Sequence, residues 1–220
     1  MKLEELKLNK KGLLIVLSGF SGCGKGTVMK ALLEQYPEEF SLSVSATTRA
    51  PRLGEQEGVA YFFKTKAEFE ALIAEDALLE YANYVGNYYG TPKAYVQTQL
   101  NAGKNVFLEI EMQGALKVKE AFPETFLMFL VPPSIPELIS RLEGRGTETG
   151  ETVHSRMAQA LEELKVIPRY DCVVVNNDIA QCVADVYNIV KHPELGKPYT
   201  KEQLDDLEEQ LRRYLKGDKS

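Results

Sequence analysis

The chain has 220 residues, of which 44% are hydrophobic and 26% charged, a composition that excludes a largely disordered or fibrous protein. The net charge of −6 excludes a general affinity for nucleic acid or anionic membranes, and no apolar run reaches the roughly 20 residues of a membrane span. Cys23, Cys172 and Cys182 lack the spacing of a zinc site or disulfide framework, and no secretory signal precedes them, which predicts free thiols in a cytoplasmic protein.

Short apolar runs rich in Val, Ile and Phe alternate along the chain with helical patterns. The runs that predict buried strands are Leu13–Ser18, Val106–Ile110, Phe126–Val131 and Cys172–Val175. The helical patterns are Lys25–Gln35, Pro92–Ala102, Gln113–Ala121, Ile135–Leu142, Glu151–Val166 and Ile179–Val190. This alternation predicts an α/β protein in three α/β/α layers, with a parallel core sheet covered by helices on both faces.

The first predicted strand runs directly into a glycine-rich turn that opens a helix. The turn reads Gly19-Phe-Ser-Gly-Cys-Gly-Lys-Gly-Thr27, which has the spacing and the context of a P-loop. Its backbone N–H groups are expected to turn inward around phosphate oxygens, while the helix N-terminus and Lys25 add positive charge. On this motif alone, GTPases, ATPase motors and small-molecule kinases all stay open.

The segment Ser41–Tyr89 interrupts the alternation. Short β-like pieces at Ser41–Ala46, Tyr61–Phe63 and Leu78–Tyr84 surround one helix near Lys66–Ala74, which predicts an inserted antiparallel lobe. Its first part is rich in hydroxyl groups and carries Arg49 and Arg52. Because the planar guanidinium group suits phosphate, these arginines are interpreted as a second anion site, with a solvated basic loop as the alternative.

A second group of arginines consists of Arg141, Arg145 and Arg156. The first two flank the start of a polar, Gly-rich stretch at Gly144–Glu151, which predicts a mobile loop, and Arg156 is expected to face the same space. Two anion sites and a mobile arginine loop indicate phosphoryl transfer between two phosphorylated substrates, a reaction that depends on positioning and charge neutralisation.

The chain after His192 predicts a helical extension. Thr200 and Gln203 have the spacing of a capping box, and leucines follow at helical spacing, at Leu204, Leu207, Leu211 and Leu215. We expect this helix to pack on its own domain, and a dimer or partner helix is the alternative.

Four segments resemble the signatures of the guanylate kinase family and occur in the family's order. They are Ser43-Val-Ser-Ala-Thr-Thr-Arg-Ala-Pro-Arg52, Gly86-Asn-Tyr-Tyr-Gly-Thr91, Glu109-Ile-Glu-Met-Gln-Gly114 and Arg141-Leu-Glu-Gly-Arg-Gly-Thr-Glu-Thr149. The resemblance covers roughly Gly12 to Val190 and implies direct, in-line transfer of a phosphoryl group from ATP to GMP, and also to dGMP, with Mg²⁺. It also implies a P-loop core at 1–40 and 92–192 with a mobile lid at about 141–157, an inserted GMP-binding lobe of mixed α/β structure at 41–91, and a C-terminal helical extension at 193–220.

The resemblance assigns roles to residues by their position. It implies that ATP is bound by Gly19, Ser21, Gly22, Cys23, Gly24, Lys25, Gly26, Thr27 and Asn176. It implies that GMP is bound by Ser45, Arg49, Arg52, Tyr61, Glu80, Tyr89, Thr91, Glu109 and Glu111, with Glu80 accepting hydrogen bonds from guanine. Catalytic roles fall to Lys25, Arg49, Arg141, Arg145 and Arg156.

The sequence and the resemblance also lead to expectations about metal binding and partners. Gly26 stands where many P-loops have a magnesium-binding hydroxyl residue, so we expect Mg²⁺ to be held by phosphates or, through water, by Thr27 or Glu109. The family usually has Asp at the position of Glu111. The expected partners are ATP and GMP, without nucleic acid or membrane, in a monomer or homodimer.

Two other functions are weighed against this one. Guanylate-kinase-like modules of scaffold proteins keep the fold and bind peptides without catalysis, but their P-loop is commonly degraded, whereas here Lys25 and the glycines are intact. A kinase for another nucleoside monophosphate is the second alternative, and base recognition through Glu80 decides it.

Overall fold

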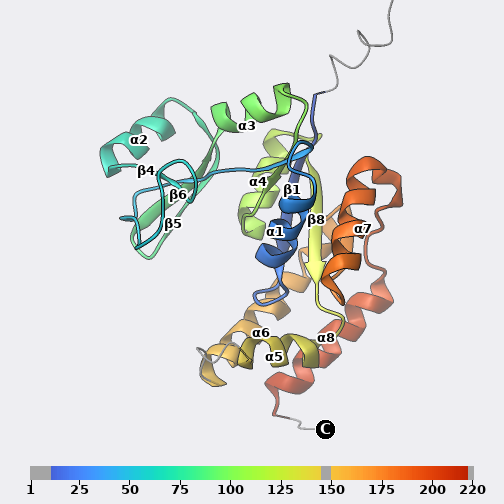
Figure 1. Ribbon diagram of the computed structural model, residues 1–220. Coiled ribbons are helices and arrows are strands. Elements are labelled where there is room, and N and C mark those ends of the chain that lie inside the picture. Colours follow the sequence, from blue (N-terminus) through green and yellow to red (C-terminus); the bar gives the residue numbers. More distant parts are fainter. Residues whose placement is uncertain (1–10, 145–149, 218–220) are drawn as a thin grey trace, which may run out of the picture. The chain divides into compact units, whose positions relative to one another are not determined.

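The computed structural model describes residues 11–144 and 150–217, which form two compact units (Figure 1). The first unit consists of Tyr36–Thr125 and the described residues up to Val16. The second consists of Leu17–Gln35 and the described residues from Phe126 onward. Strand β1, Leu14–Gly19, contributes residues to both units.

A parallel sheet forms the core of the fold and has the strand order β2-β7-β1-β8-β9. The remaining strands are β2 Phe40–Leu42, β7 Asn105–Leu108, β8 Phe126–Val131 and β9 Cys172–Val175. Strands β1 and β2 each pair in parallel with β7, and β8 pairs in parallel with β9. Their side chains are buried almost throughout, as expected for a sheet with both faces covered. The predicted α/β class with a parallel core sheet is confirmed.

The first unit also contains a mixed sheet of four strands in the order β4-β3-β6-β5. These strands are β3 Ala46–Thr47, β4 Phe62–Phe63, β5 Leu78–Tyr84 and β6 Asn87–Pro92. Helix α2, Lys66–Ala74, packs on this sheet through Phe69, which is fully buried and stacks on Tyr88. A capping box between Thr65 and Glu68 begins the helix.

Two predictions for this region were wrong. Ser41–Ala46 is not one piece of an antiparallel lobe, because Phe40–Leu42 joins the parallel sheet beside β7, where the ring of Phe40 is buried against Phe107. The second sheet is not purely antiparallel either, since β3 and β4 run in parallel. The sequence also does not predict β6, because Gly90 and Pro92 indicate a turn more than a strand.

Helices α3, Lys93–Asn101, and α4, Met112–Ala121, complete the first unit. Helix α3 contacts β6 and β7, and α4 contacts β5. Only three residues, the last of them the N-cap Glu111, separate the end of β7 from the start of α4. The carboxyl end of a parallel strand and the first turn of α4 therefore lie together, which is the usual place for ligand-binding residues in such sheets.

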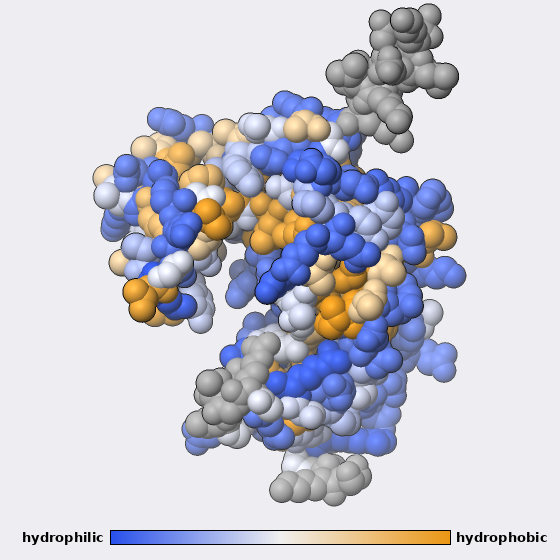
Figure 2. All heavy atoms as spheres, viewed as in Figure 1, coloured by the Kyte–Doolittle hydropathy of each residue, from blue (hydrophilic) through white to orange (hydrophobic). Residues whose placement is uncertain are grey.

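The second unit contains five helices and two short 3₁₀ turns within its described residues. They are α1 Lys25–Gln35, α5 Ile135–Glu143, α6 Gly150–Leu164, α7 Ile179–Lys191 and α8 Lys201–Leu215, with η1 Ile167–Arg169 and η2 Pro193–Leu195. Helix α1 packs on α7, and α8 packs on α5 and α6 (Figure 1). Hydrophilic side chains dominate the surface over α5, α6 and α8 on the face seen in Figure 2.

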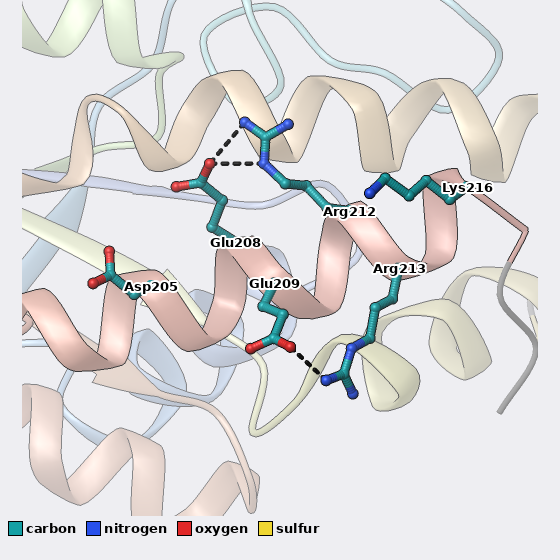
Figure 3. Close-up of a pocket in the computed structure, with 6 residues that line it drawn as sticks. All are labelled: Asp205, Glu208, Glu209, Arg212, Arg213 and Lys216. Carbon is teal, nitrogen blue, oxygen red and sulfur yellow. Dashed lines mark hydrogen bonds and ion pairs between the residues drawn. The ribbon is translucent and has the colours of Figure 1, made fainter.

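The C-terminal helix α8 packs on its own unit, as predicted. Leu207 and Leu211 are buried, and the backbone N–H of Ile135 donates to Gln210 Oε1 at 3.1 Å. The outer face of α8 borders a shallow hollow of about 480 Å³ lined by Asp205, Glu208, Glu209, Arg212, Arg213 and Lys216. Figure 3 shows that two of its acids, Glu208 and Glu209, pair with Arg212 and Arg213, which lie four residues later along the helix. Such exposed pairs stabilise a helix by a few tenths of a kcal/mol.

No helix within the described parts of the chain is long and apolar enough to cross a membrane.

Because the side chain of Leu211 is fully buried on the inner face of α8, Leu211→Ala should lower the free energy of unfolding by about 2–5 kcal/mol. Urea denaturation measures this change. Leu195→Ala is the matched control, since the Leu195 side chain is mostly exposed and its loss should change stability by less than about 0.5 kcal/mol. Equal effects of the two substitutions would contradict the packing of α8.

Candidate functional site

The glycine-rich turn between β1 and α1 has the backbone conformation of a phosphate-binding loop. Gly22 and Gly24 both have φ of +92°, a region that side chains rarely adopt. A Cβ at Gly22 would lie 2.6 Å from Leu142 Cδ2, and one at Gly24 would lie 2.5 Å from Asn176 Nδ2. Glycine is therefore required at both positions by conformation and by space.

Lys25, at the first position of α1, folds back over the loop. Its Nζ donates hydrogen bonds to the carbonyl oxygens of Gly19 at 2.7 Å and Phe20 at 3.3 Å. Phe20 itself is fully buried and packs edge-to-face on Phe129, so the aromatic residue anchors the loop in the core. The ammonium group is thus held at the mouth of the loop, where a phosphate oxygen can replace a carbonyl as its acceptor.

Two predicted site residues support the loop from the side. Arg156 on α6 donates from its guanidinium group to the hydroxyl of Ser21. Asn176, which follows β9, is buried at 1% exposure and donates from Nδ2 to the carbonyl of Cys23 at 2.7 Å. The structure therefore brings Arg156 to the loop itself, and it places the Asn176 side chain in the protein interior beneath the loop.

The other residues predicted for ATP binding and catalysis differ in their contacts and exposure. Arg141 on α5 donates from Nε to Glu137 Oε1 at 2.9 Å, one helical turn away. Gly26 and Thr27 are exposed in the first turn of α1. Arg145 and most of the predicted mobile loop lie outside the described residues.

The first unit contains a cavity of about 410 Å³ that collects most of the residues predicted to bind GMP. They are Ser45, Tyr61, Glu80, Tyr89, Glu109 and Glu111. The strands β5 and β6 supply Glu80 and Tyr89, while Glu109 and Glu111 come from the end of β7 and the start of α4. Residues as far apart in the chain as Ser45 and Lys117 thus line one cavity because the mixed sheet lies beside α4.

Glu80 is the most constrained carboxylate of this cavity. The hydroxyl of Thr91, on the neighbouring strand β6, donates to Glu80 Oε1 at 2.8 Å, and Thr91 is fully buried. Burial raises the pKa of Glu80 above its ordinary value, against the hydrogen bond from Thr91 and the charge of Lys117, which both lower it. The carboxylate is therefore held in one orientation, with its second oxygen toward α4.

Arg49 lies beside the cavity in the loop after β3, and Arg52 is exposed in the same loop. The guanidinium group of Arg49 lies over the ring of Tyr61, 5.3 Å from its centroid, and it donates to both carboxylate oxygens of Glu55 at 2.8 and 3.0 Å. The backbone N–H of Arg52 also donates to Glu55, so both arginine residues hold the pKa of this carboxyl below its usual value.

Sequence reasoning missed three residues of the first unit that the structure brings into the site. Glu55 orients Arg49, and its position six residues later in a loop provides no periodic signal. Gln113 and Lys117 line the cavity from α4, one turn apart. Their spacing of four residues marks a common helix face, but only the packing of α4 on β5 shows what that face contacts.

Two of the predicted site residues carry side-chain oxygen atoms that could be ligands of Mg²⁺, a hard divalent cation. Among residues 11–144 and 150–217 no three acidic, histidine or cysteine side chains form a cluster that could hold a metal. Thr27 and Glu109 are exposed and carry oxygen ligands of the type that Mg²⁺ prefers. Since Mg²⁺ keeps several waters and takes most of its other ligands from substrate phosphates, these residues fit the ion.

Comparison with known proteins identifies the family. The sequence model of the guanylate kinase family matches residues 11–193. The chain belongs to the guanylate kinase family. It is 55% identical over 181 residues to a guanylate kinase of Halalkalibacterium halodurans, covering 82% of this chain and 88% of the relative. It is 52% identical over 183 residues to a guanylate kinase of Bacillus subtilis, covering 83% and 90%.

A solved structure of the family agrees with the fold. The crystal structure of guanylate kinase from Anaplasma phagocytophilum matches with a TM-score of 0.65 at 30% identity, covering 89% of this chain and 94% of that one. The family match ends before α8, so the C-terminal helix lies beyond the part of the chain that the family model describes.

The three cysteines of this family member are all buried free thiols. Burial raises the pKa of Cys23, and it raises those of Cys172 and Cys182 to about 12. Since the thiolate is the nucleophile, we expect Ellman's reagent to label the native protein very slowly at pH 8 and all three cysteines quickly in denaturant. Fast labelling of the native protein would contradict the burial of the loop residue Cys23.

Proposed function

We propose that this protein transfers the γ-phosphoryl group of ATP to GMP, and to dGMP, and so acts as a nucleoside monophosphate kinase. The observation that carries the proposal is the pairing of two features in one chain of the family. One is an intact phosphate-binding loop with Lys25 at its mouth, and the other is a cavity with the oriented carboxylate of Glu80. The free thiols fit a cytoplasmic location.

The ATP side is assigned to the second unit. The backbone N–H groups of residues 19–27 and the N-terminus of α1 bind the phosphates, and Lys25 exchanges its carbonyl acceptors for β- and γ-phosphate oxygens. Arg156, Arg141 and Arg145 stabilise the charge of the transferring group. Asn176 supports the loop through the Cys23 carbonyl.

The GMP side is assigned to the first unit. Glu80 accepts hydrogen bonds from guanine N1–H and the exocyclic amine, and adenine is rejected because it leaves a buried carboxylate without these donors. Ser45, Tyr61 and Tyr89 line the path to the acceptor phosphate, which Arg49 and Arg52 bind. Thr91 orients Glu80, and Glu109 and Glu111 line the cavity beside the base.

The chemistry requires no general base, because the acceptor phosphate oxygen is already anionic near pH 7. Transfer depends on in-line placement of donor and acceptor oxygens and on neutralising their charge. Mg²⁺, when bound, supplies part of that neutralisation, with Thr27 or Glu109 as its ligands through water. The domain boundaries proposed for this function are a core at 1–40 and 92–192, a GMP-binding lobe at 41–91, a lid at about 141–157 and an extension at 193–220, except that Ser41 and Leu42 belong to strand β2 of the core sheet.

Lys25→Met should lower kcat by about 10²- to 10³-fold, because it removes the one full positive charge of the loop. An assay that couples ADP release to NADH oxidation measures turnover with ATP and GMP. Lys30→Met is the matched control, since Lys30 lies on the same helix α1 with an exposed side chain. Near-normal turnover of the Lys25 variant would contradict the assignment of the loop.

Glu80→Gln should raise KM for GMP by about 10- to 100-fold and leave KM for ATP unchanged, because the amide offers one acceptor oxygen to two guanine donors. The same assay is run with GMP, AMP, CMP and UMP. Glu70→Gln on the exposed face of α2 serves as the control. An unchanged KM for GMP, or equal wild-type rates with AMP and GMP, would refute guanine recognition by Glu80.

A further inference from the structure

The cavity around Glu80 contains three carboxylates and a single ammonium group. Glu80, Glu109 and Glu111 supply the carboxylates, and Lys117 on α4 supplies the ammonium group. Among the described residues that line the cavity, Lys117 is the only lysine, arginine or histidine. Neither the arginines proposed for phosphate binding nor the residues of the glycine-rich loop line this cavity. Phosphate binding therefore does not explain why the ammonium group of Lys117 lies at this cavity.

The backbone brings Lys117 to the same side of α4 as Glu80. A Cβ atom at Gly114 would lie 3.2 Å from Glu80 Oε2, so the second carboxylate oxygen lies directly against the helix at this glycine. Lys117 follows three residues later, and residues at this spacing lie on one helix face. Because Gly114 has no side chain, the Glu80 carboxylate can lie against helix α4 at this position. The positive charge of Lys117 follows one turn further along the helix.

The other groups that face Glu80 do not stabilise its negative charge by charge of their own. The other titratable residues that line the cavity are Tyr81 and Tyr84 from β5, Tyr89 from β6 and Tyr61 from the loop before β4. Glu109, which follows β7, and Glu111, the N-cap of α4, carry charge of the same sign as Glu80. Thr91 contributes a hydrogen bond, and Lys117 contributes the opposing charge that lowers the pKa of Glu80.

The ionisation state of Glu80 decides what it recognises. A carboxylate presents acceptors to both guanine donors, whereas a protonated carboxyl group directs one donor at them. We propose that Lys117 is a positioning residue for guanine recognition, whose ammonium group keeps Glu80 in the carboxylate form that accepts the guanine N–H groups. This inference rests on the proposed function of Glu80 and adds the residue that sets the pH range over which Glu80 can perform it.

The test is the pH profile of kcat/KM for GMP from pH 5 to 8.5, for the wild-type protein and for Lys117→Met. Since Glu80 must be ionised, kcat/KM falls as the pH falls through its pKa. Loss of the nearby cation raises that pKa further, so the fall begins at a higher pH in the variant than in the wild type. The ratio of kcat/KM in the variant to kcat/KM in the wild type should fall below one at acidic pH and return toward one near pH 8.5.

The ratio of variant to wild type is the decisive quantity. The phosphate of GMP also titrates in this range, but its contribution is the same for both proteins and cancels in the ratio. Values of kcat at saturating GMP and of KM for ATP should be unchanged, and Lys117→Arg should restore the wild-type profile. Lys66→Met, which removes an exposed lysine of α2 in the same unit, should leave the profile unchanged.

A ratio that does not vary with pH overturns the inference, as does a Lys117→Arg variant that behaves like Lys117→Met. Combining Lys117→Met with Glu80→Gln separates this inference from the function it rests on. In that background the pH-dependent effect of Lys117 should vanish. If Glu80→Gln alone leaves GMP recognition intact, the base-reading function fails, whereas a normal Lys117→Met profile beside an impaired Glu80→Gln refutes Lys117 alone.

Discussion

A chain with a net charge of −6 that binds two phosphorylated nucleotides must overcome its own electrostatic repulsion. The structure meets this constraint locally. The glycine-rich turn directs backbone N–H groups and the positive end of α1 at one place, which adds attraction for anions without adding to the number of charged side chains. The parallel sheet makes this possible, because it delivers β1 into the turn at its carboxyl end.

Four of the cations proposed to bind phosphate are each held by a local acceptor. Lys25 donates to loop carbonyls, Arg49 to Glu55, Arg141 to Glu137 and Arg156 to Ser21. These contacts restrict the long side chains before a nucleotide arrives, so less conformational entropy is lost on binding. A phosphate group that replaces such an acceptor meets a hydrogen-bond donor that is already oriented. A small number of arginines can therefore suffice for phosphoryl transfer.

In the proposed function, recognition of the base depends on the opposite arrangement, a negative group held in a partly desolvated cavity. On the proposed assignment, the buried Glu80 carboxylate rejects an unsuitable base because that base leaves it without donors. Burial also favours protonation of this carboxylate. The hydrogen bond from Thr91 and the inferred effect of the Lys117 charge both oppose protonation of Glu80. Selectivity and ionisation are therefore coupled through the packing of α4 on β5.

Much of the fold follows from local pattern. The strands Phe126–Val131 and Cys172–Val175 and the helices Lys25–Gln35 and Lys66–Ala74 have the bounds predicted from the sequence, since apolar periodicity, capping residues and glycine conformations act over a few residues. Predictions were poorest around Phe40–Leu42 and β6. The first was assigned to the wrong sheet and the second was not recognised, because strand pairing depends on residues far away in the chain.

By itself the sequence determined the glycine turn, the order of elements and the resemblance to a kinase family, because each of these is written in short runs of neighbouring residues. The tertiary structure alone decided that Glu55 orients Arg49, that Asn176 lies buried beneath the loop and that Lys117 shares a cavity with Glu80. These relations join residues up to 153 positions apart. Burial and electrostatic interaction act through space, so they exist only once the sheets and helices have packed.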